Sequence, residues 1–213
     1  KVYTAEVLPQ RAMDLFKARK YEKAMKAFTT AAEKLGYNAD ALEKAALCAY
    51  HLDQYEKAAA LAKRISDAAA SKTVQMRLMS LAGQHEQLID AFGAADIAAW
   101  PAETSGKAFY YRGTAYASLN KNEKAETDLK KALDNLPAGR FRGQAALRLA
   151  QHYKRNLKNP DKALEAFLYT KKIEKERDRW GWKFFSTVAS AASILREQGK
   201  YDKALEILSE AKG

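Results

Sequence analysis

The stretch FYYRGTAYASLNKNEKAETDLKKALDNLP, residues 109–137, decides the fold of this 213-residue chain. Large and small residues recur in it at helical spacing on both sides of a short polar turn. Gly113 and Ala125 are small enough to let two antiparallel helices approach closely, and Tyr116 and Leu129 can fill the space beside them. The stretch therefore predicts a hairpin of two closely packed α-helices.

The same pattern recurs along the rest of the chain. The phrase KYEKA at 20–24 returns as QYEKA at 54–58, which is 34 residues later, and PDKALEAF at 160–167 is echoed by YDKALEIL at 201–208. Six helical hairpins are therefore predicted, with the third shortened and irregular, and their approximate bounds are 8–35, 39–70, 71–99, 105–137, 141–179 and 181–213.

These hairpins resemble the tetratricopeptide repeat, a unit of about 34 residues with a conserved pattern of aromatic and small residues. In the fourth unit the matching residues are Phe109, Gly113, Tyr116, Ala125, Leu129, Ala132 and Pro137. Arg112 departs from the Leu that the repeat usually has at its place. The resemblance implies an all-α, right-handed superhelical solenoid, with residues 1–213 forming one domain. It also implies a non-catalytic scaffold that binds another protein or a peptide.

The resemblance implies a binding groove lined by the first helices of successive repeats. Carried over to this chain, the groove residues are Tyr50, His51, Arg77, Tyr110, Thr114, Arg148, Gln151, Lys154, Arg155 and Arg196. The alternative interpretation is that each is an ordinary solvated side chain. A subfamily that clamps a C-terminal carboxylate uses Lys and Asn in these helices. Because Pro9 and Met13 stand there in the first unit, and Tyr110 and Thr114 in the fourth, such a clamp is not expected.

The charge of the chain bears on its partner. The formal net charge is +11, and residues 139–183 alone carry thirteen Lys or Arg and five Asp or Glu. This basic surface favours an acidic peptide or protein as partner. Nucleic acid is the alternative, and it is less favoured because bases alternate with acids in KKIEKERDR at 171–179, as on a solvated helix.

No motif of an enzyme or metal site appears in the sequence. His51, His85 and His152 lie in three different units, and Cys48 with His51 supplies only half of a metal site. The sequence therefore predicts no catalysis, no cofactor and no metal. A third hypothesis is that the chain is the interaction module of a larger enzyme or regulator.

Composition and length leave the compartment open. No apolar stretch approaches the roughly 18 residues that span a bilayer. The chain begins with Lys1, so a processed or excised form of a longer protein is expected, either cytoplasmic or exported after loss of a signal peptide.

The last unit carries two further expectations. Val188, Leu195 and Leu208 belong to an apolar stripe that no following repeat in the sequence covers, which predicts self-association there. Trp180 and Trp182 are interpreted as a hydrophobic staple for the last hairpin, with a partner anchor as the alternative.

Overall fold

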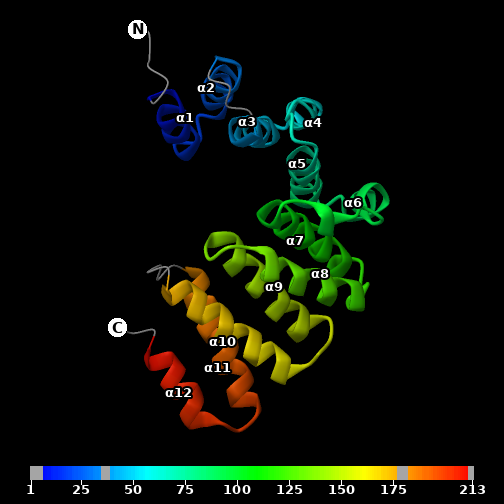
Figure 1. Cartoon of the computed structure of the whole chain (residues 1–213). Helices are drawn as coiled ribbons and strands as arrows, with labels where there is room; N and C mark the ends of the chain where they lie inside the picture. Colours follow the sequence, from blue (N-terminus) through cyan, green and yellow to red (C-terminus); the bar gives the residue numbers. More distant parts are fainter. Residues whose placement is uncertain (1–6, 35–38, 177–181, 211–213) are drawn as a thin grey trace. The chain divides into compact units, whose positions relative to one another are not determined.

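A computed structural model describes residues 7–34, 39–176 and 182–210 (Figure 1). The regular structure of these residues is helical throughout, which confirms the all-α prediction. The helices are α1 (Val7–Lys17), α2 (Tyr21–Lys34), α3 (Ala39–His51), α4 (Tyr55–Lys63), α5 (Ala68–Leu81), α6 (His85–Phe92), the 3₁₀ helix η1 (Ile97–Ala99), α7 (Ala102–Ser118), α8 (Asn122–Asn135), α9 (Arg140–Arg155), α10 (Pro160–Glu176), α11 (Trp182–Glu197) and α12 (Tyr201–Ser209). Across the described ranges, no helix combines the length and the apolarity needed to cross a lipid bilayer.

The chain divides into two compact units, Lys1–Gln87 and Leu88–Gly213, and the boundary falls within α6. In the first unit each helix from α1 to α5 packs against the next along the chain. Its core joins Ala, Leu and Phe side chains such as Phe28 and Leu42, both at most 3% exposed. Cys48 lies in this core, and burial raises the pKa of its thiol to about 12, so it behaves as a small apolar residue.

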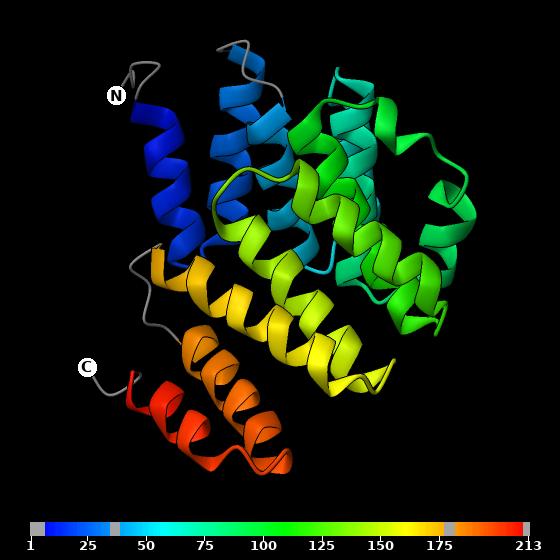
Figure 2. The same cartoon turned by 60° about the horizontal axis from the view of Figure 1, so that its bottom comes forward.

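In the second unit α7 to α12 also pack in chain order. Figure 2 shows α9, α10, α11 and α12 of this unit as successive neighbours, coloured from light green to red. Gly113 sets the contact between α7 and α8, because a Cβ atom there would lie 3.0 Å from Leu129 Cγ and 3.1 Å from its backbone nitrogen. The core includes Leu129, Leu149 and Phe167, all at most 5% exposed. The side chains of Trp180 and Trp182 lie outside the described residues, so their predicted role stays a prediction.

Five of the hairpin turns close in the same way. The second residue after the first helix has positive φ, and the next backbone N–H donates to the carbonyl oxygen of the residue five positions earlier, as in a Schellman motif. The five residues with positive φ are Arg19, Asp53, Gly83, Asn120 and Gly199, and the bonds run from Lys20 to Leu15, Gln54 to Ala49, Gln84 to Met79, Lys121 to Tyr116 and Lys200 to Leu195, each 2.9 Å long. These five turns therefore share one backbone geometry.

Candidate interaction site

The candidate site lies where α7 meets α9 in the second unit. Arg148 of α9 donates from Nη2 to Ser118 Oγ at 3.2 Å and to the Thr114 carbonyl oxygen at 3.4 Å, both on α7. Tyr110, one turn before Thr114, packs against the core and places its ring 5.2 Å from that of Tyr111, edge to face. We call the surface formed by Tyr110, Thr114, Ser118, Arg148 and Arg155 the α7–α9 face.

Arg148 is half-buried, and its charge is not neutralised by any carboxylate among the described residues. Its Nε and the Thr114 hydroxyl oxygen are both buried without a hydrogen-bond partner in this part of the chain. Burial lowers the pKa of the Arg148 guanidinium, and the charge of Arg155 nearby adds to the lowering, whereas interaction with Tyr110 raises it. Arg remains protonated at neutral pH despite such shifts, so a positive charge is held at the α7–α9 face at a cost in desolvation.

The whole of α9 is basic. Its sixteen residues include no Asp or Glu, and its basic residues are Arg140, Arg142, Arg148, Lys154 and Arg155. Arg142 is engaged, since it donates to the Leu136 carbonyl and to the Tyr169 hydroxyl, both at 3.1 Å. Lys154 and Arg155 are exposed, and Gln151 is half-buried on the same helix. The predicted residues Tyr110, Thr114, Arg148 and Arg155 are therefore brought together by α7 and α9.

Arg112, in the same unit, is an arginine whose positive charge is neutralised by a carboxylate, that of Asp128. Its Nε donates to Asp128 Oδ2 at 2.7 Å and its Nη2 to Asp128 Oδ1 at 3.1 Å, so the pair is bidentate. Its Nη1 donates to the carbonyl oxygens of Phe92, Gly93 and Ala95 at 3.1–3.3 Å. The two charged side chains are 11% and 6% exposed. Arg112 thus ties the segment after α6 to α7 and α8, a role that the sequence did not predict.

The three predicted residues of the first unit make contacts with other side chains of that unit. Arg77 on α5 forms an ion pair with Glu43 on α3. His51 stacks on Tyr21, with ring centroids 4.6 Å apart, and burial followed by the charges of Arg77 and Arg19 lowers its pKa. Tyr50 packs edge to face against His51 at 5.8 Å. The involvement of Tyr50, His51 and Arg77 in a binding groove stays a prediction.

Arg196, the last predicted residue, lies exposed on α11 beside an open cavity of about 380 Å³. The other lining residues are apolar or small and come from both helices of the last hairpin: Ala189, Ala192, Ser193, Tyr201, Ala204, Leu205 and Leu208. Arg196 is thus part of the surface of the last hairpin, formed by α11 and α12.

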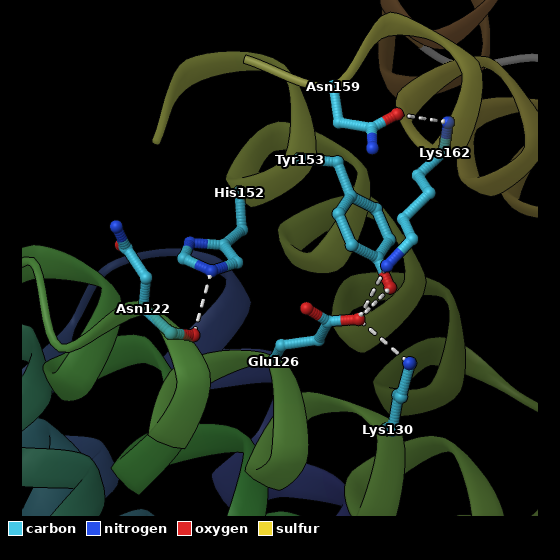
Figure 3. A network of polar contacts seen from close by, with 7 residues as sticks. All are labelled: Asn122, Glu126, Lys130, His152, Tyr153, Asn159 and Lys162. Carbon is cyan, nitrogen blue, oxygen red and sulfur yellow. Dashed lines mark hydrogen bonds and ion pairs between the residues drawn. The ribbon is translucent and has the colours of Figure 1, made fainter. Parts of the chain in front are cut away.

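A polar network centred on Glu126 joins α8, α9 and α10 (Figure 3). The carboxylate of Glu126 accepts from Lys130 Nζ at 2.8 Å, from the Tyr153 hydroxyl at 2.9 Å and from Lys162 Nζ at 3.3 Å. His152 Nε2 lies 3.2 Å from the Asn122 carbonyl oxygen, and burial lowers the pKa of this imidazole. Each charged member has a partner inside the network, so its role is to hold three helices in register.

Solved structures identify the fold. No protein-family model and no curated protein matches the sequence. PilW, described as a widely conserved type IV pilus biogenesis factor, is 18% identical with a TM-score of 0.67, covering 99% of this chain and 93% of its own. Two further similar structures are MamA, from residue 41 to its end, of Desulfovibrio magneticus RS-1 (18% identity, TM-score 0.55, 82% of this chain and 97% of that one) and a tetratricopeptide repeat protein from Parabacteroides merdae ATCC 43184 (17%, 0.54, 97% and 78%). The chain therefore has the tetratricopeptide-repeat fold that its sequence pattern predicted.

Proposed function

We propose that this protein is a non-catalytic scaffold that binds an acidic segment of another protein at the α7–α9 face. The observation that carries the proposal is Arg148, a half-buried guanidinium whose charge has no carboxylate partner among the described residues. A desolvated charge of this kind costs stability unless an opposite charge is supplied. A carboxylate of the partner would supply it through a charge-assisted hydrogen bond.

The fold supports binding as the general role. Stacked helical repeats form extended surfaces that are rigid before the partner arrives, which reduces the entropy lost on association. Tyr110 adds an aromatic side chain beside Arg148, and aromatic residues with Arg are the residue types that dominate binding energy in protein interfaces.

Electrostatics supports an acidic partner in particular. Because α9 contains five bases and no acid, its field attracts acidic segments and speeds their encounter with the α7–α9 face. Arg77 in the first unit is instead paired with Glu43, and Arg112 with Asp128. Among these three arginines, Arg148 is the one that an external carboxylate fits best.

The proposal is tested with a displayed library of short peptides selected on the purified chain. We expect enrichment of peptides containing Asp or Glu, and an affinity that falls as salt rises, because screening shortens the range of the attraction. For the best peptide, Arg148→Met should weaken binding roughly tenfold or more, which corresponds to about 1.5 kcal/mol for a lost charged hydrogen bond. The double change Arg148→Glu with Arg155→Glu should abolish binding.

Arg140→Gln is the matched control, because it removes one exposed positive charge from the same helix. It should change peptide affinity by less than about twofold, as expected for a rim charge. Arg148→Met should keep or raise the melting temperature, since it removes a desolvated charge that no carboxylate neutralises. Selection of neutral peptides that bind wild type and Arg148→Met equally would refute the proposal.

Nucleic-acid binding is the second candidate, and the basic α9 is the observation that favours it. Fluorescein-labelled single-stranded and duplex oligonucleotides distinguish the two. Tight binding to either with a steep salt dependence, together with no selected peptide, would assign α9 to phosphate contacts instead. A role as the interaction module of a larger enzyme or regulator is compatible with the peptide result.

A further inference from the structure

Helices α10 and α12 share a short sequence, so the environments of equivalent residues in the two helices can be compared. The five residues DKALE occur both in α10, at 161–165, and in α12, at 202–206. Leu164 in α10 is partly buried against the core, whereas the equivalent Leu205 in α12 is 66% exposed. Three residues further on, Phe167 is 2% exposed and the equivalent Leu208 is 40% exposed. The same helical face is thus covered in α10 and uncovered in α12.

The helix that covers α10 shows what fits such a face. Both α10 and α12 pack against the first helix of their own hairpin, α9 or α11, but α10 also packs against α11. Ala191 and Ile194 of α11, each 1% exposed, belong to the same core cluster as Phe167 of α10. On α12 the uncovered face begins with Tyr201, which is 63% exposed, and it continues into the open cavity between α11 and α12. Large apolar side chains that lie exposed next to one another on one face are typical of an interaction surface.

We propose that the α11–α12 face, made by Ala189, Ala192, Arg196, Tyr201, Leu205 and Leu208, is the interface of a two-fold symmetric dimer with a second copy of this chain. In this arrangement each copy lays its α12 over the partner's α11, so Leu205 and Leu208 enter the cavity of the other subunit. The same patch then meets itself, as a two-fold interface requires.

Charge is arranged to permit this self-contact. Arg196 lies at the α11 edge of the face, and Asp202 and Glu206, one turn apart on α12, lie beyond Tyr201 and Leu205 at the other edge. Laying α12 of one copy over α11 of the other brings the basic edge of each face against the acidic edge of its partner. The described residues 182–210 carry four bases and four acids, so this segment has no net charge that would oppose contact between two copies.

The test is analytical ultracentrifugation of the 213-residue chain over a wide range of protein concentration. We expect a reversible monomer–dimer equilibrium for wild type and a monomer for Leu205→Glu. Leu168→Glu is the matched control, because Leu168 is also an exposed leucine of the second unit, 37% exposed, but lies on α10 outside the face. This control should dimerise like wild type.

A charge exchange tests the symmetry of the interface. Arg196→Glu and Glu206→Arg should each weaken the dimer, and the double variant should restore it, because each edge would again meet an opposite charge. Circular dichroism of all variants checks that helix content is retained. Wild type that stays monomeric at every concentration would overturn the proposal, and so would a dimer that survives Leu205→Glu. A double variant no stronger than the single variants would overturn the two-fold arrangement.

Discussion

Replacing Arg112 by Leu, the residue that the repeat usually has at this place, should destabilise the second unit. Arg112 is 11% exposed and its partner Asp128 is 6% exposed, so the variant leaves a carboxylate buried without a counter-charge. Breaking a buried pair by removing one partner costs about 3–5 kcal/mol. The bidentate contacts of 2.7 and 3.1 Å place this pair at the strong end of its class.

The double variant Arg112→Leu with Asp128→Ala separates the cost of the orphaned charge from the other contacts. It removes the buried carboxylate as well, so it should be less destabilised than Arg112→Leu alone. What remains is loss of the hydrogen bonds to the carbonyl oxygens of Phe92, Gly93 and Ala95, about 1–3 kcal/mol. Leu at 112 can offset part of this loss by packing.

Urea unfolding followed by tryptophan fluorescence measures the stability of the second unit, in which Arg112 and Asp128 lie. All three tryptophans, Trp100, Trp180 and Trp182, belong to the second unit, so their emission reports that unit even if the first unfolds separately. The free energies of wild type, both single variants and the double variant form a thermodynamic cycle. If the double variant loses as much stability as the two single variants together, the pair is not coupled and the reasoning fails.

Two further predictions concern the packing and the polar network of the second unit. Gly113→Leu should cost roughly 1–3 kcal/mol by overpacking, because its Cβ atom alone would lie 3.0 Å from Leu129 Cγ; an unchanged melting temperature would disprove this contact. The hydrogen bond from Lys130, with those from Tyr153 and Lys162, lowers the pKa of Glu126 from 4.5 to about 2, so the stability it contributes is present above 4.5 and is lost as the pH falls toward 2. After allowance for solvent screening this amounts to about 1 kcal/mol, and Glu126→Gln should show a correspondingly shallower loss of melting temperature between pH 5 and 2 than wild type. Parallel acid profiles would contradict the assignment.

The sequence predicted the helical hairpins because their pattern is local and repeated. Gly113 could be interpreted as a close contact because small residues recur at helical spacing on both sides of one turn. Tyr110, Thr114, Arg148 and Arg155 were predicted as groove residues from their place in the repeat. Arg148 lies near the other three, and their role in binding stays a prediction.

What could not be predicted depends on partners far apart in the sequence. The role of Arg112 requires Asp128 on another helix and three carbonyls that become acceptors only where α6 ends. A charged residue in an apolar position was the one signal available. The different exposure of Leu164 and Leu205, within identical local sequence, is set wholly by what packs on top.

Arg112 and Arg148 are similar in sequence context but are expected to serve different purposes, stability of the fold and binding of the partner. Both are arginines on the first helix of a hairpin, and both are withdrawn from solvent. Arg112 donates hydrogen bonds to a carboxylate and to three carbonyl oxygens within the described chain. Its removal breaks all of these bonds and should lower the free energy of unfolding. Arg148 meets a hydroxyl and a carbonyl oxygen but no carboxylate, so its removal should cost the fold little and the complex much. Replacing Arg112 should therefore lower the stability of the fold, whereas replacing Arg148 should lower the affinity for the partner. This contrast is expected if the scaffold uses the Arg148 charge to bind a carboxylate of its partner.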